Sequence, residues 1–130
     1  MSKMEFSRLG SRIQLTTDDN TEIGSWDAAN NVDSHSKGIW PNGVYNFGYY
    51  VAHPGDPPDS AYGSHGIFVF DVTDREGMGV HSGREDIPDG LGRRGFRHCT
   101  MGCIRTTDDA TAQLLRTHAV DPIKSINVSD

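Results

Sequence analysis

The stretch FRHCTMGCIRTTDDA, residues 96–110, contains both cysteines of the chain, Cys99 and Cys103. A thiol can serve as a nucleophile, a metal ligand, half of a disulfide or a small buried side chain. A disulfide between these two cysteines would close a tight ring whose geometry is difficult in an extended segment. Zinc would need further donors, and C-x₃-C without a second paired motif is weak evidence for them. The zinc ligands would be Cys99, Cys103 and His98, with His81 or His65 as the fourth.

Cys103 has the sequence surroundings of a nucleophile. It follows Gly102, which permits close backbone approach and unusual backbone angles. The start of a predicted helix lies a few residues later, and its unpaired N–H groups favour negative charge. These neighbours predict a lowered thiol pKa and backbone donors for an oxyanion. Cys99 lacks them, so we expect it to pack.

A nucleophilic cysteine needs a base, and the best candidate is His81 in GMGVHSG. It ends an apolar predicted strand, and a glycine-rich loop leads from it back to Cys103. A papain-like arrangement would need its histidine after the cysteine. The histidine in that position, His118, falls late in the predicted helix rather than on a strand, so the chain order favours His81.

Short alternating runs broken by turn residues predict a mostly β protein that positions these groups. The expected strands are 13–17, 22–28, 44–52, 66–72, 78–81 and 123–128. Residues 53–66, with three prolines, and residues 83–97 are expected as long loops. One helix is expected after the cysteines. Thr107 would cap it, Asp108 and Asp109 suit its positive end, and Ala110, Leu114 and Leu115 would form its buried stripe.

The chain has 130 residues, which we expect to form a single domain over 1–130. Its net charge of −6 argues against a nucleic-acid partner. It has no run of roughly 20 apolar residues to span a membrane, and its N-terminus lacks the apolar run of a signal peptide.

Four segments together resemble the catalytic domains of bacterial L,D-transpeptidases. They are WPNGVYNFG at 40–48, GVHSG at 79–83, TMGCIRTTDDATAQL at 100–114 and the final strand IKSINV. The resemblance covers about residues 10–128 and implies an L,D-transpeptidase-like β-sandwich or barrel with one short helix after the catalytic cysteine.

The resemblance implies a catalytic set of Cys103 as nucleophile, His81 as base, the Ser82 carbonyl as orienting group, and the N–H groups of Gly102 and Cys103 as oxyanion donors. It also implies that Arg105, Thr100, Met101 and Tyr45 contact the substrate. Arg105 could equally pair with Asp108 or Asp109. Tyr45, Tyr49 and Trp40 could line the cleft, but aromatic residues in strands usually pack in the core, which is the favoured role for each. No metal or organic cofactor is implied.

The implied substrates are peptidoglycan stem peptides, a tetrapeptide donor and an amine acceptor, and the implied site of action is the bacterial cell envelope or periplasm. Family members usually have histidine where this chain has Met101, and its loss also resembles the divergent, toxin-like branch. An effector of that kind would have an immunity or delivery partner. The alternatives are a non-catalytic cell-wall-binding domain on the same fold, and the zinc-binding domain considered above.

Overall fold

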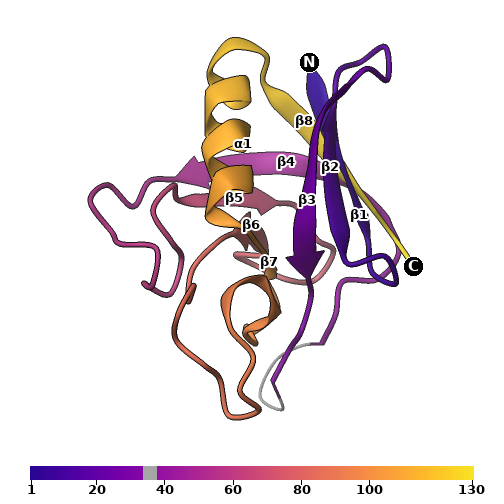
Figure 1. Cartoon of the computed structure of the whole chain (residues 1–130). Coiled ribbons are helices and arrows are strands. Elements are labelled where there is room, and N and C mark those ends of the chain that lie inside the picture. Colours follow the sequence, from indigo (N-terminus) through magenta and orange to yellow (C-terminus); the bar gives the residue numbers. More distant parts are fainter. Residues whose placement is uncertain (34–37) are drawn as a thin grey trace.

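The structure is a computed structural model that describes residues 1–33 and 38–130. Within these residues, eight strands close into a barrel in the order β1-β2-β3-β7-β6-β5-β4-β8 (Figure 1). The strands are β1 (Ser2–Ser7), β2 (Arg12–Thr16), β3 (Glu22–Ala29), β4 (Gly43–Val51), β5 (Ile67–Phe70), β6 (Gly79–His81), β7 (Ile104–Thr106) and β8 (Ile123–Ser129). The helices are the 3₁₀ turn η1 (Gly95–Arg97) and α1 (Asp108–Val120).

Two strand pairs in this barrel are parallel, β1 with β8 and β6 with β7. Parallel neighbours cannot be joined by a tight turn and need a long crossover. Between β6 and β7 the crossover is the segment 82–103, which includes η1 and both cysteines. The chain therefore leaves the barrel after His81 and returns to it at Ile104, directly after Cys103.

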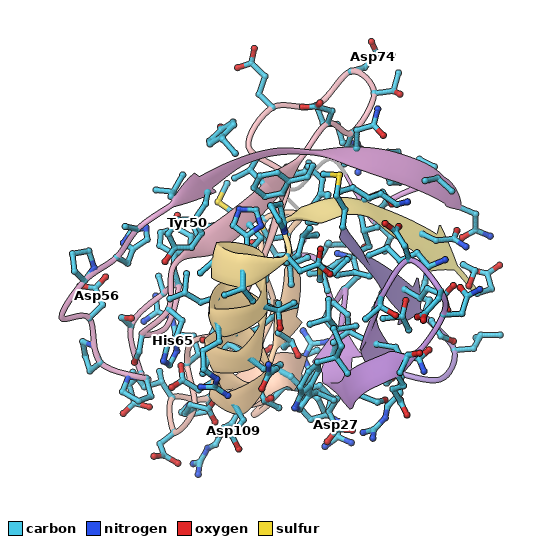
Figure 2. The ribbon with its side chains drawn as sticks, turned by 90° about the horizontal axis from the view of Figure 1, so that it is seen from above. Asp27, Tyr50, Asp56, His65, Asp74 and Asp109 are labelled. Carbon is cyan, nitrogen blue, oxygen red and sulfur yellow. The ribbon has the colours of Figure 1, made fainter. Side chains whose placement is uncertain are left out.

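The barrel interior is the hydrophobic core. Alternation along β8 illustrates how it is filled, since Ile126 and Val128 are buried while Asn127 between them is exposed. Trp40 and three phenylalanines are among the largest fully buried side chains. Loops project outwards from this core, and Figure 2 shows Asp56 and Asp74 at their tips at the edge of the molecule.

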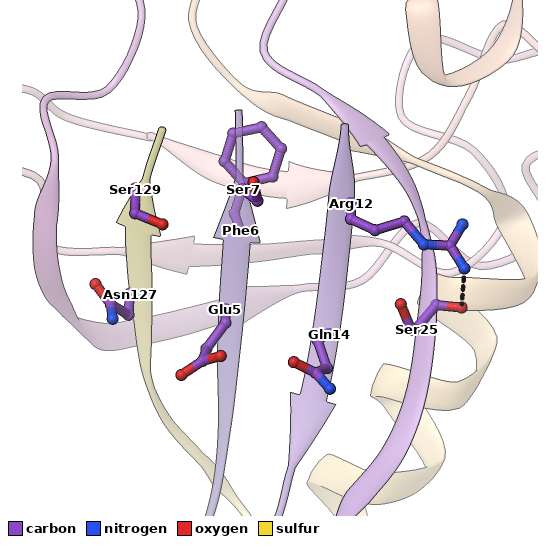
Figure 3. A pocket seen from close by; sticks show the side chains of 8 residues that line it. All are labelled: Glu5, Phe6, Ser7, Arg12, Gln14, Ser25, Asn127 and Ser129. Atoms are coloured by element: carbon purple, nitrogen blue, oxygen red, sulfur yellow. Dashed lines mark hydrogen bonds between the residues drawn. The ribbon is translucent and has the colours of Figure 1, made fainter. Parts of the chain in front are cut away.

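The outer face of β8, β1, β2 and β3 is polar. Asn127 pairs with Glu5, Glu5 with Gln14, and Gln14 with Ser25, so four hydrogen-bonding side chains form one row across four strands (Figure 3). The opposite faces of the same strands fill the core, which is the period-two pattern of a half-buried sheet.

Helix α1 begins as the sequence predicts. The Thr107 hydroxyl accepts the Ala110 N–H at 3.1 Å, and Asp108 and Asp109 occupy the first turn. Leu114 is buried in the core. Near the other end, the His118 ring lies 4.7 Å from that of Phe47 on β4, measured between ring centroids. The described part of the chain has no helix that is long and apolar enough to cross a membrane.

The predicted fold class is confirmed, and each of the six expected strands is present within about two residues of its predicted bounds. Two strands were missed. β1 has no β-branched residue, and its pairing with β8, which is distant in sequence, adds to that with the neighbouring β2. β7 has three residues and is held between β3 and β6. The turn η1 lies within the predicted loop 83–97.

Candidate active site

The pairing of β6 with β7 brings the predicted catalytic residues to one face. His81 is the cross-strand partner of Arg105, and Cys103 lies two residues before Arg105. Because side chains alternate along an extended chain, Cys103 and Arg105 share a face with His81. All three line a pocket of about 300 Å³. Its other lining residues with polar or sulfhydryl side chains, among those described, are Cys99, His98, Arg84, Thr100, Tyr62 and Asp33.

The His81 imidazole is fixed in one tautomer. It is 1% exposed, and its Nδ1 lies 2.6 Å from the Ser82 carbonyl oxygen. A carbonyl only accepts, so Nδ1 has the proton and Nε2 has the free lone pair. Burial lowers the pKa of His81 to about 4 against the opposing effect of this hydrogen bond, and the Arg105 charge lowers it further. At neutral pH the imidazole is therefore uncharged and able to accept a proton.

The Cys103 thiol is also neutral at rest. Burial raises its pKa, and a hydrogen bond from the Gly79 backbone only partly offsets that rise. The sequence predicted a lowered thiol pKa from the nearby helix start. The structure gives the opposite direction, because β7 separates Cys103 from α1 and the helix dipole acts only within its first turn. Among the described residues, no hydrogen bond joins Cys103 to His81.

The peptide bond between Gly102 and Cys103 is held in place from the core side. The Gly102 carbonyl accepts the Trp40 indole N–H at 2.7 Å and the Asn30 amide at 3.0 Å. In a planar trans peptide the N–H points opposite to the C=O. The Cys103 N–H therefore points away from Trp40 and Asn30, as an oxyanion donor must.

Gly102 is required by this geometry. Its φ of +139° disfavours other residues, and a Cβ here would approach the Met78 sulfur within 3.0 Å. The Gly102 N–H, which we expected as a second oxyanion donor, instead donates to the Thr100 hydroxyl at 3.1 Å. The Cys103 N–H is left as the oxyanion donor from this turn.

Arg105 is buried and lacks an acidic partner among the described residues. Its guanidinium donates to the carbonyls of His98 and Cys99, each at 3.0 Å, and to that of Ala61 at 2.9 Å. The expected alternative, an ion pair with Asp108 or Asp109, does not form. Nε is buried without a partner. Burial, and next the charge of Arg84, lower the pKa of Arg105 to about 10. The pocket therefore contains a buried positive charge to which no carboxylate of the described residues is bonded.

Arg84 is a second pocket cation, which no sequence motif indicates. Its backbone has a φ of +55°, which is uncommon outside glycine. This conformation is held by hydrogen bonds from its N–H to the Ser60 carbonyl at 3.1 Å and to its carbonyl from the Gly95 N–H at 2.8 Å. No ion pair of Arg84 occurs within residues 1–33 and 38–130. Two guanidinium groups in one pocket favour an anionic ligand group such as a carboxylate.

The remaining predicted substrate contacts differ in their placement. Thr100 lines the pocket, but its hydroxyl donates to the Cys103 carbonyl at 2.6 Å, so it braces the turn. Met101 lines the pocket mouth and is 70% exposed. Tyr45 does not line the pocket. It is buried with its ring edge-on to Trp40, and its hydroxyl donates to the Pro41 carbonyl, so the packing alternative holds.

Asn30, whose amide holds the Gly102 carbonyl, was not predicted as a site residue, because an asparagine after a strand resembles a turn residue.

A metal site has less support. Both cysteines are free, and the one cluster of potential ligands within the described residues consists of Asp89, His98 and Cys99, without Cys103. Asp89 already accepts four hydrogen bonds, two on each oxygen. Its donors are the N–H groups of Leu91, Arg93 and Cys99 and the Arg93 side chain. Asp89 therefore has no lone pair left for a cation without loss of a bond.

A second hollow, of about 250 Å³, lies on the polar outer face of β1, β2, β3 and β8 (Figure 3). It is lined by carboxylate, amide, hydroxyl and guanidinium groups, and neither a thiol nor an imidazole is among its lining residues. The pocket that contains Cys103 and His81 is therefore the candidate active site.

Comparisons with known proteins identify the fold. No family profile matches the sequence, and no curated protein matches it significantly. Among solved structures, Bd1075 of Bdellovibrio bacteriovorus is similar, with a TM-score of 0.64 and 17% identity over 97% of this chain and 46% of that one. L,D-transpeptidase 1 of Mycobacterium tuberculosis has a TM-score of 0.58 and 16% identity, over 99% of this chain and 62% of that one. Pgp2 of Campylobacter jejuni, a helical cell shape determining protein, has a TM-score of 0.61 and 16% identity, over 98% of this chain and 46% of that one.

At these identities the likeness establishes the fold alone. The chain has the fold of L,D-transpeptidases, and it spans about half to three fifths of the length of these structures.

Proposed function

We propose that this protein is a cysteine acyltransferase that acts on peptidoglycan stem peptides in the manner of an L,D-transpeptidase. The main support is the pocket shared by Cys103 and His81, in which the Nδ1 proton of His81 is committed to the Ser82 carbonyl and Nε2 is left as a base. The fold shared with solved L,D-transpeptidases supports the substrate class.

The first half-reaction acylates Cys103. Its sulfur attacks the carbonyl carbon that joins the third residue of the stem, a diamino acid, to the terminal D-residue. As the C–S bond forms, the thiol proton moves to His81 Nε2, because both groups start neutral. The Cys103 N–H stabilises the oxyanion. The C–N bond then breaks, His81 protonates the leaving amine, and the D-amino acid departs.

The second half-reaction releases the thioester. An acceptor amine attacks the thioester carbon and loses a proton to His81, and that proton returns to the departing sulfur. A stem-peptide amine gives a cross-link, a free D-amino acid gives an exchange product, and water gives L,D-carboxypeptidase activity. None of these steps requires a metal or organic cofactor.

The arginines of the pocket fit such a substrate, because stem peptides have free carboxylates. Arg84 and Arg105 would bind one of them, while Met101 at the mouth would contact the peptide chain. A peptidoglycan substrate would place the site of action in the bacterial cell envelope.

The test is incubation with purified tetrapeptide muropeptides, followed by mass spectrometry of the products. We expect loss of the terminal D-residue, or its exchange for an added D-amino acid, in the parent protein and in Cys99→Ala. Cys103→Ala, with an unchanged circular dichroism spectrum, should give neither product. Products from Cys103→Ala at the parent's rate would refute the proposal.

A further inference from the structure

The residues behind His81 connect it to the start of helix α1. Ser82 follows His81, and because side chains alternate along a strand, it points away from the pocket. Its side chain is fully buried, and its hydroxyl donates to Asp108 Oδ1 at 2.9 Å. Asp108 is the first residue of α1. The Ser82 peptide, whose carbonyl orients His81, is therefore tied to a carboxylate on another element.

The Asp108 carboxylate is fixed by further contacts. The Ser64 N–H donates to the same Oδ1 at 3.3 Å, and His65 Nδ1 lies 3.5 Å from it. Figure 2 shows His65 beside helix α1. The Asp108 N–H donates to Glu85 at 3.3 Å. This one side chain thus joins the loop 52–66, the end of β6 and the start of the helix.

Ser82 has little freedom to move. The Thr111 hydroxyl, on the next turn of α1, lies 3.3 Å from Ser82 Oγ. On the other side Gly63 is packed so closely that a Cβ there would overlap Ser82 Oγ. With its side chain confined, the Ser82 carbonyl has a fixed direction, 2.6 Å from His81 Nδ1.

We propose that Asp108 is a positioning residue for His81. Its carboxylate holds the Ser82 hydroxyl, this bond fixes the Ser82 peptide, and the Ser82 carbonyl fixes the tautomer and direction of the imidazole. The importance of this for catalysis rests on the proposed function, in which His81 is the base. The contacts themselves do not depend on it.

Asp109 provides a matched control. It is the same residue type in the same helical turn, so its removal costs the same favourable interaction with the helix dipole. It is exposed, and Figure 2 shows it at the outer edge of the molecule. Asp108→Ala and Asp109→Ala therefore differ in the contacts of the Asp108 carboxylate with Ser82, Ser64 and His65. Asp108→Asn keeps an acceptor oxygen for the Ser82 hydroxyl and serves as the rescue variant.

The experiment follows the His81 Nδ1 proton by NMR, which requires no turnover. Its downfield resonance is assigned by its loss in His81→Gln. We expect Asp108→Ala to accelerate exchange of this proton with water about 10-fold or more. We also expect kcat on muropeptides to fall about 10-fold, because an imidazole that is no longer held in position accepts the thiol proton less efficiently. Asp109→Ala should leave both unchanged, and Asp108→Asn should restore most of both.

An unchanged exchange rate in Asp108→Ala would overturn the positioning role. So would equal changes in Asp108→Ala and Asp109→Ala with equal losses in Tm, since both acids would then only stabilise the helix. Faster exchange in Asp108→Ala, in a protein that does not process muropeptides, would uphold the positioning and refute the proposed function instead.

Discussion

His81 and Arg105 are direct cross-strand partners on the parallel strands β6 and β7, one an uncharged imidazole and the other a buried cation. The Arg105 charge adds to the effect of burial in lowering the pKa of His81. With Cys103 two residues upstream on the same face, this pairing places nucleophile, base and cation in one pocket. The chemistry proposed above follows from that arrangement.

The reactivity of Cys103 should increase only at high pH. Burial raises its pKa, so the thiolate forms above the ordinary range of about 8.5 for a free cysteine. In a Cys99→Ala background, the iodoacetamide labelling rate should have its midpoint above that value, and at pH 7 labelling should be slower than for a free cysteine. A midpoint below pH 7 would mean that a thiolate–imidazolium pair exists at rest.

Stability should fall on the acid side because of His81. Its folded pKa of about 4 lies below the ordinary 6.5, so between these values the unfolded chain binds more protons than the folded one. This contribution is complete above pH 6.5 and is lost as pH falls to 4, by about 3 kcal/mol. Urea unfolding across this range should show the loss in the parent and a flatter profile in His81→Gln. Equal slopes would contradict the buried neutral imidazole.

Trp40→Phe should impair acylation without a change in thiol reactivity. It removes the indole N–H that holds the Gly102 carbonyl, so the Cys103 N–H becomes less well directed. We expect kcat to fall about 10-fold, with the pH profile of Cys103 labelling unchanged. Trp26→Phe, at the partly buried second tryptophan, is the control. A comparable loss of kcat in both variants would argue against this role of Trp40.

The two pocket arginines should respond differently to substitution. Arg84→Gln removes a charge whose side chain bonds no group among the described residues, so KM for stem peptides with free carboxylates should rise about 10-fold, with kcat little changed. Arg105→Lys keeps the charge but loses the planar guanidinium group that donates to the His98, Cys99 and Ala61 carbonyls. Its kcat should therefore fall as well, and its Tm should drop. Arg84→Gln should have no effect on KM for amidated substrates; an equal rise for both substrates would exclude carboxylate recognition.

The sequence was informative where local signals agree with the fold. The helix cap at Thr107, the turn residues and the alternating strands are local features. That His81 and Cys103 line one pocket could be predicted from their motifs. Arg84 and Asn30 could not, because their places in the site depend on loop packing and on a contact across 72 residues, from Asn30 to Gly102. The direction of the thiol pKa was predicted wrongly because burial in the folded pocket raises it, while β7 separates Cys103 from the helix start.

The most direct test of a thioester at Cys103 is the intact mass of the protein during turnover of a tetrapeptide donor without an acceptor amine. We expect an added mass equal to the donor minus its terminal D-residue, present in the parent and in Cys99→Ala. Peptide mapping should locate it on Cys103 as a hydroxylamine-labile thioester, absent from Cys103→Ala. An adduct that persists in Cys103→Ala, or donor turnover by that variant at the parent's rate, would contradict a thioester mechanism at Cys103.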